Sequence, residues 1–153
     1  MRLWERVVAT GLYTGYFPFA SGTAGSAFAL AIYALVPGFA GSWVAAAVAI
    51  VVLSALSVPA ATAAERDFGH DGSPIVVDEI VGQWIAIAGL AATPAALALA
   101  FLFFRAFDIV KPYPAGRSQH WPGGWGVLAD DVFAGIYAAV ATRVVLHFTG
   151  WGA

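Results

Sequence analysis

The feature that most constrains this chain is a long stretch without any charge. No Asp, Glu, Lys or Arg occurs from residue 7 to residue 64, and eight of the nine acidic residues fall in two short segments, 65–79 and 105–131. A charged side chain in the hydrocarbon core of a bilayer costs about 3 kcal/mol on insertion scales. Charges this rare and this clustered are typical of a membrane-embedded protein that gathers its polar chemistry at one surface.

The composition supports the same interpretation. Hydrophobic residues make up 61% of the 153 residues and charged residues only 10%, whereas globular domains average about 25% charged residues. We therefore expect one membrane-embedded domain over residues 1–153. The net charge of −2 gives no electrostatic footprint for a nucleic-acid partner. The absence of cysteine excludes disulfides, thiolate metal sites and cysteine nucleophiles.

The apolar runs predict an all-α fold, a polytopic bundle of short helices that crosses the membrane several times. The runs cover about 26–36, 43–64, 80–104 and 132–149, with a short interfacial helix within 1–16 and a turn-rich stretch at 17–26. Pro37, Gly38 and Gly41 separate the first two runs.

The run at 80–104 allows two topologies. It is long enough for a single crossing, which would put the two acidic segments on opposite sides of the membrane. Pro94 near its middle also allows a helical hairpin of about 79–91 and 95–110, which would put both acidic segments on one side. We favour the hairpin, because one site can then use both segments. Most of the Lys and Arg residues lie on that side, so the positive-inside rule makes it cytoplasmic.

Two pairs of adjacent acids are the main candidates for a metal site. Asp78 and Glu79 stand where a polar loop enters an apolar helix, and Asp130 and Asp131 stand at the predicted start of the last helix. One acidic pair at a helix start usually caps the helix and interacts with its dipole. Two such pairs in a chain with nine acids favour metal ligation at the membrane surface.

A second group of charges lies at the end of the predicted 95–110 helix. Arg105 and Asp108 are three residues apart, which also fits an ordinary ion pair. Next to the acidic pairs, Asp108 is a candidate ligand or base, and Lys111 is a candidate phosphate-binding cation.

Small residues and hydroxyls at 21–26, SGTAGS, open a helix. Backbone N–H groups at such a helix start can approach an anion, so Gly22, Thr23 and Ser26 are candidate phosphate contacts. The stretch lacks the lysine and spacing of a P-loop, and small residues also serve close helix packing. Arg117 is a candidate head-group contact. The segment with Asp71 fits a solvated loop, and the Gly-rich stretch 123–126 fits a turn.

Four blocks together resemble the phosphatidylglycerophosphatase A family, over nearly the whole chain from Thr10 to about Ala138. They read GYFPFASGTAGS, IVVDEIVGQW, FRAFDIVKPYPA and GGWGVLADDVFAG. The resemblance implies a magnesium-dependent, multi-pass phosphatase of the bacterial inner membrane. Its substrate would be a membrane phospholipid, phosphatidylglycerol phosphate, which it would convert to phosphatidylglycerol and phosphate.

The expected mechanism assigns roles to these residues. Asp78, Glu79, Asp130 and Asp131 would hold Mg²⁺, an ion that takes oxygen ligands. Asp108 would be the general base or a nucleophile, with Lys111 and Asp131 as further catalytic residues; the phosphate contacts would be Gly22, Thr23, Ser26, Arg105 and Arg117. A CDP-alcohol phosphatidyltransferase ranks second, because Asp71-Gly72 lacks the Ala-Arg that should follow. An ion or proton carrier ranks third, because its acids should lie deep within the helices.

Overall fold

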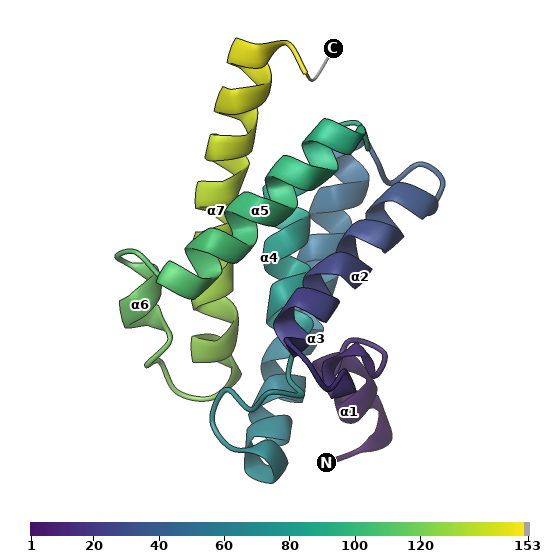
Figure 1. Cartoon of the computed structure of the whole chain (residues 1–153). Helices are drawn as coiled ribbons and strands as arrows, with labels where there is room; N and C mark the ends of the chain where they lie inside the picture. The colour runs from purple at the N-terminus through teal and green to yellow at the C-terminus, as the bar shows by residue number, and fades with distance from the viewer. Residues whose placement is uncertain (152–153) are drawn as a thin grey trace.

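The computed structural model describes residues 1–151, and over that range it consists of helices and the turns that join them (Figure 1). No strand occurs in this range, which confirms the predicted all-α class. The elements are α1 (Leu3–Ala9), the 3₁₀ turn η1 (Thr14–Tyr16), α2 (Ser21–Leu35), α3 (Trp43–Phe68), α4 (Val77–Ile87), α5 (Pro94–Val110), α6 (Ala115–Ser118) and α7 (Gly124–Thr149).

Helices α3 and α7 have the length and the surface of membrane-spanning helices. Each has 26 residues, which at 1.5 Å per residue gives about 39 Å. Their most apolar windows have mean hydropathies of 2.4 and 1.5, yet only 22% and 28% of those windows are buried inside the molecule. The central helix of a soluble protein would instead bury its apolar side chains. Outward-facing apolar helices of this length indicate a membrane protein.

Helices α4 and α5 form the hairpin that Pro94 suggested. Helix α4 ends at Ile87, and Thr93 caps α5 by accepting a hydrogen bond from the Ala96 N–H at 3.2 Å. The start of α4 and the end of α5 both approach the same part of α7, so the two acidic segments meet at one end of the molecule. The prediction of a break is confirmed.

Helix α4 lies at the centre and is surrounded by α2, α3, α5 and α7 (Figure 1). Two glycines allow its close approach to α7. A Cβ on Gly82 would lie 2.7 Å from the backbone oxygen of Asp131, and a Cβ on Gly135 would lie 2.5 Å from the backbone oxygen of Gly82. Small residues at such a crossing let two backbones approach. This contact fixes the position of Asp131 relative to the first turn of α4.

The start of α7 differs from the prediction. The helix begins at Gly124 instead of residue 132, so the Gly-rich stretch is its first turn. The Gly124 N–H donates to the Thr62 hydroxyl at 2.8 Å, and a Cβ on Gly124 would clash with the backbone carbonyl oxygen of Val58. Packing against α3 therefore selects glycine here. Asp130 and Asp131 consequently lie in the second turn and do not cap the helix.

Helix α2 starts at Ser21, where SGTAGS was expected to open a helix, so the turn-rich region ends at residue 20 and not at residue 26.

Candidate active site

Three carboxylates from two helices, two of them buried and that of Glu79 half-buried, meet where α4 begins. Asp78 and Glu79 lie in the first turn of α4, and Asp131 faces them from α7. One carboxylate oxygen from each lies within 4.8 Å of the other two. Asp78 is 5% exposed and Asp131 is 1% exposed. We call these three residues the carboxylate triad.

The triad lacks the hydrogen bonds that buried carboxylates need. Asp78 Oδ1, Glu79 Oε2 and Asp131 Oδ2 are buried oxygens without a hydrogen-bond partner. Each unmade hydrogen bond of a buried group costs about 1–3 kcal/mol, and the like charges add repulsion. A divalent cation would remove both costs. Because Mg²⁺ prefers oxygen ligands, the carboxylate oxygens of this donor set fit that ion.

Two cations, Arg105 and Lys111, lie beside the triad at the end of α5 and are held there by Asp108. We call these three residues the cationic arm. Lys111 donates a hydrogen bond to Asp130 and lies 3.4 Å from Asp108 Oδ1, while Arg105 donates to Asp108 Oδ2. Burial by itself would lower the pKa of Lys111, but the hydrogen bond to Asp130 and the charges of nearby aspartates raise that pKa above its ordinary value. Lys111 therefore stays protonated at neutral pH.

Lys111 ends α5 in a conformation that the sequence did not indicate. Pro112 predicted extended geometry for the preceding residue, but Lys111 has φ 48° and ψ 61°, in the left-handed region. Such a conformation is uncommon for a residue with a side chain and occurs often at functional sites. Here it accompanies the contacts of the ammonium group with Asp130 and Asp108.

The first turn of α2 packs directly against one residue of the triad, Glu79, and one of the cationic arm, Arg105. A Cβ on Gly22 would lie 3.0 and 3.1 Å from the guanidinium nitrogens of Arg105 and would also meet Glu79. The first N–H groups of a helix have no intrahelical partners and can bind an anion. Ser26, one turn further, is fully buried, and its hydroxyl has no partner.

Most of the predicted site residues come together in the structure. Three of the four predicted metal ligands form the triad, whereas Asp130 binds Lys111 instead. Asp108, Lys111 and Arg105 form the adjacent arm, and the ion pair between Arg105 and Asp108 is present as expected. Arg117 is exposed on α6, and its side chain makes no hydrogen bond within the described residues.

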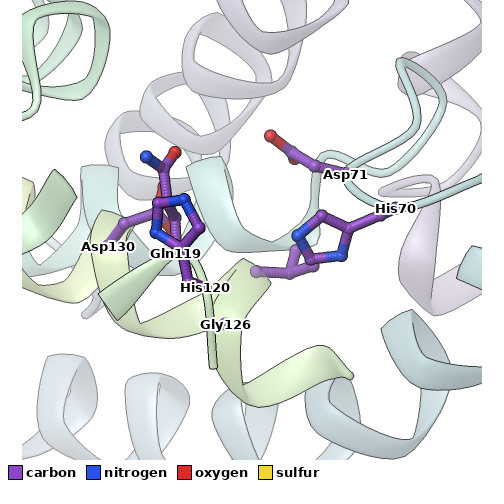
Figure 2. A pocket seen from close by; sticks show the side chains of 7 residues that line it. His70, Asp71, Gln119, His120, Gly126 and Asp130 are labelled. Atoms are coloured by element: carbon purple, nitrogen blue, oxygen red, sulfur yellow. The ribbon is translucent and has the colours of Figure 1, made fainter. Parts of the chain in front are cut away.

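Two features escaped the sequence interpretation. Gln83, one turn after Glu79, is fully buried, and neither atom of its amide has a partner. A polar residue inside the apolar IVVDEIVGQW block was the available signal. The second feature is a polar pocket beside Asp130, lined in part by His70 and Asp71 (Figure 2). It joins segments about 50 residues apart, so no local pattern indicated it.

The family model and two of the three relatives carry the same family name. The family model for phosphatidylglycerophosphatase A matches residues 7–146. A Bacteroides thetaiotaomicron protein named "Putative phosphatidylinositol-3-phosphatase" is 38% identical over 151 residues, covering 94% of each chain. Phosphatidylglycerophosphatase A of Escherichia coli is 30% identical over 149 residues, covering 94% of this chain and 82% of the relative.

The Haemophilus influenzae protein of the same name is 37% identical over 81 residues, covering 52% of this chain and 50% of the relative. No solved structure matches. The family model spans the triad, the cationic arm and the start of α2. The chain belongs to the phosphatidylglycerophosphatase A family and is a phosphoric monoester hydrolase.

Proposed function

We propose that this chain removes the terminal phosphate of phosphatidylglycerol phosphate, in a magnesium-dependent reaction that leaves phosphatidylglycerol in the membrane. The observation that carries the proposal is the carboxylate triad, whose buried oxygens lack partners beside two cations, Lys111 and Arg105. The name of the family and of its Escherichia coli member supports this lipid as the substrate.

A phosphate monoester resists attack by water because its oxygens are anionic and its leaving alkoxide is basic. Mg²⁺ held by Asp78, Glu79 and Asp131 would neutralise charge on the phosphoryl oxygens. Lys111 and Arg105 would bind the same phosphoryl group and balance the charge that develops as phosphate leaves. The N–H groups at Gly22 and Thr23 would orient it.

Asp108 stays a candidate for base or nucleophile. Its two oxygens already face Arg105 and Lys111, so it also holds the cationic arm in place. Oδ1 of Asp108 lies 3.4 Å from Lys111, which is a longer contact than that between Oδ2 and Arg105. Oδ1 is therefore the oxygen better able to accept a proton from an attacking water. Trapping of a phosphorylated Asp108 would instead indicate a nucleophile.

The same geometry supports a proposal for the membrane arrangement. We place α3 and α7 across the bilayer, with the triad at the cytoplasmic surface, where the Lys and Arg residues gather. Helices α4 and α5, of 11 and 17 residues, measure about 16 and 25 Å, so they need tilting or local thinning of the bilayer. The acyl chains would stay in the lipid while the head group reaches the triad.

A second substrate has one specific observation in its favour. The Bacteroides thetaiotaomicron relative, 38% identical over 94% of both chains, carries the name of a phosphatidylinositol-3-phosphatase. Both lipids present a phosphate monoester on a hydroxylated head group, so the triad and the cationic arm would serve either.

The test is phosphate release by the protein purified in detergent, with phosphatidylglycerol phosphate or phosphatidylinositol 3-phosphate, in Mg²⁺ or EDTA. We expect Mg²⁺-dependent release from the first lipid, abolished in Asp131→Asn. Faster release from phosphatidylinositol 3-phosphate would show that this lipid is the preferred substrate, and the proposed phosphatase reaction would still hold. No release from either lipid by a folded preparation would overturn the proposal and direct the search to CDP-alcohol transfer.

A further inference from the structure

A polar pocket of about 190 Å³ adjoins the active site and has no role in the mechanism above. One wall is the loop between α3 and α4, with His70 and Asp71. The other wall follows α6 and carries Gln119 and His120. Figure 2 shows these walls facing each other, with Asp130 on the side of Gln119. The remaining lining comes from the first turns of α7, Gly126 and Val127.

The hydrogen bonds of the walls leave acceptor groups available. The Gln119 side-chain N–H donates to the Gly116 carbonyl at 2.9 Å, which orients the amide and leaves its oxygen free to accept. Nδ1 of His70 is held by Glu65 at 2.5 Å, which leaves Nε2. Asp71 is held in the left-handed region at φ 51°, an uncommon conformation for a residue other than glycine.

The charges of the pocket exclude two classes of ligand. No Lys or Arg lines it, and two carboxylates do, so it repels a phosphate group. A single metal ion does not fit either. Within residues 1–151, the only set of three acid or histidine ligand atoms close enough for one ion is the carboxylate triad. The pocket suits a neutral group that donates hydrogen bonds to both walls.

The position of the pocket connects it to the reaction. Asp130 lines the pocket and also binds Lys111, and the next residue, Asp131, belongs to the carboxylate triad. A phosphoryl group bound between the triad and Lys111 would therefore leave the adjoining part of its head group beside Asp130. In phosphatidylglycerol phosphate that part is a glycerol unit with one free hydroxyl.

We propose that this pocket is the polyol subsite of the enzyme, in which Asp71 and Gln119 accept hydrogen bonds from head-group hydroxyls and so determine the choice among lipid phosphates. This inference rests on the proposed function, because it assigns the part of the substrate next to the scissile phosphate. The subsite would accept glycerol or a larger polyol and would gain nothing from a head group without hydroxyls.

The test compares phosphatidylglycerol phosphate with an analogue in which propane-1,3-diol replaces the bridging glycerol. The analogue keeps both phosphates and lacks only the hydroxyl. We expect a kcat/KM at least tenfold higher for the natural lipid, as expected for a lost hydrogen bond to a charged acceptor. In Asp71→Gly, which suits a positive φ, the preference should fall below about threefold through a loss on the natural lipid alone.

Two further variants keep the outcome clear. Gln119→Met should reduce the preference without changing turnover of the analogue. Asp67→Ala removes a carboxylate from the end of α3, outside the pocket, and should keep the full preference. Equal kcat/KM for the two lipids in the wild-type enzyme, or equal losses on both in Asp71→Gly, would overturn the subsite while leaving the phosphatase function intact.

Binding separates failure of the subsite from failure of the function. Phosphatidylglycerol and its propanediol counterpart can be titrated into the protein in detergent, with binding read from tryptophan fluorescence. Tighter binding of phosphatidylglycerol that is lost in Asp71→Gly would support the subsite even if no lipid phosphate were hydrolysed. Equal binding of the two lipids would overturn it.

Discussion

The two ends of the helix bundle both bury charged side chains, but these side chains differ in whether they have hydrogen-bond partners. At the end away from the triad, Arg143 on α7 donates to the carbonyls of Ala88 and Ala139 and lies 5.0 Å above the ring of Trp43. Nearby, the Tyr33 hydroxyl donates to Leu90 at 2.6 Å. At the triad end, four buried carboxylate oxygens have no partner, one each from Asp78, Glu79, Asp130 and Asp131.

The contrast concerns the charged groups, because the neutral hydroxyl of Thr142, beside Arg143, is also buried without a partner. Arg143 satisfies the carbonyls where α4 ends, so its bonds complete the fold. The triad has excess acceptors and excess negative charge, and folding alone gains nothing from either. Substitutions at the two ends should therefore have opposite effects on stability and activity, and four predictions test this contrast.

Asp131→Asn should have the largest effect. It keeps the volume of the side chain but removes one of three converging charges, so phosphate release should fall about 1,000-fold, equivalent to several kcal/mol of lost stabilisation. Loss of like-charge repulsion should leave the thermal midpoint in EDTA unchanged or higher. Phosphate release and thermal unfolding in detergent measure both effects, with Asp67→Asn as the control. Activity above a tenth of wild type would contradict the triad as the metal site.

Lys111→Met should impair activity and stability together. Activity should fall about 100-fold, and the free energy of unfolding should fall by about 3 kcal/mol, because Asp130 stays buried without its partner. Denaturant unfolding and phosphate release measure these losses. In the double variant with Asp130→Asn, stability should recover in part while activity stays low. Recovery of both would show that the pair is purely structural.

Gly22→Ala and Gly25→Ala form a matched pair on one face of α2. The added methyl at Gly22 meets Glu79 and Arg105, so activity should fall about tenfold. At Gly25 it lies 3.0 Å from Val76, so the cost should appear as about 1 kcal/mol of stability with near-normal activity. Steady-state kinetics and denaturant unfolding of both variants measure these effects. Equal activity in the two variants would show that the first turn of α2 does not contribute to the active site.

Arg143→Met should have the smallest effect on activity. Loss of two hydrogen bonds to carbonyls and of the contact with Trp43 should lower the free energy of unfolding by about 2 kcal/mol. The kcat of the folded variant should stay within about twofold of wild type, because the site lies at the other end of α7. A large fall in kcat at unchanged stability would show that the two ends are coupled.

Much of the architecture was predictable because it depends on local composition. The charge-free stretch indicated membrane helices, Pro37 and Gly38 separated two of them, and Pro94 indicated the hairpin. The four acids of the two pairs could be singled out because a charge in an apolar chain is costly wherever it lies. These inferences need only neighbouring residues and the properties of the bilayer.

The separate roles of Asp130 and Asp131 could not be predicted, because the sequence placed both residues at the start of the last helix, whereas α7 begins at Gly124. Adjacent residues on a helix point about 100° apart, so Asp130 and Asp131 can reach different partners. Asp131 faces α4, and Asp130 turns toward Lys111. The contact between Gly82 and Gly135 decides which residue faces which helix.

The sequence by itself thus determined the all-α class, the main apolar helices and most of the residues that meet at the candidate site. Only the tertiary structure decided which carboxylates converge, which one is neutralised by Lys111, and that two loops enclose a pocket beside them. The physical reason is the distance along the chain over which each effect acts. Burial costs and helix breaks act within a few residues, whereas convergence of side chains depends on how separate helices pack.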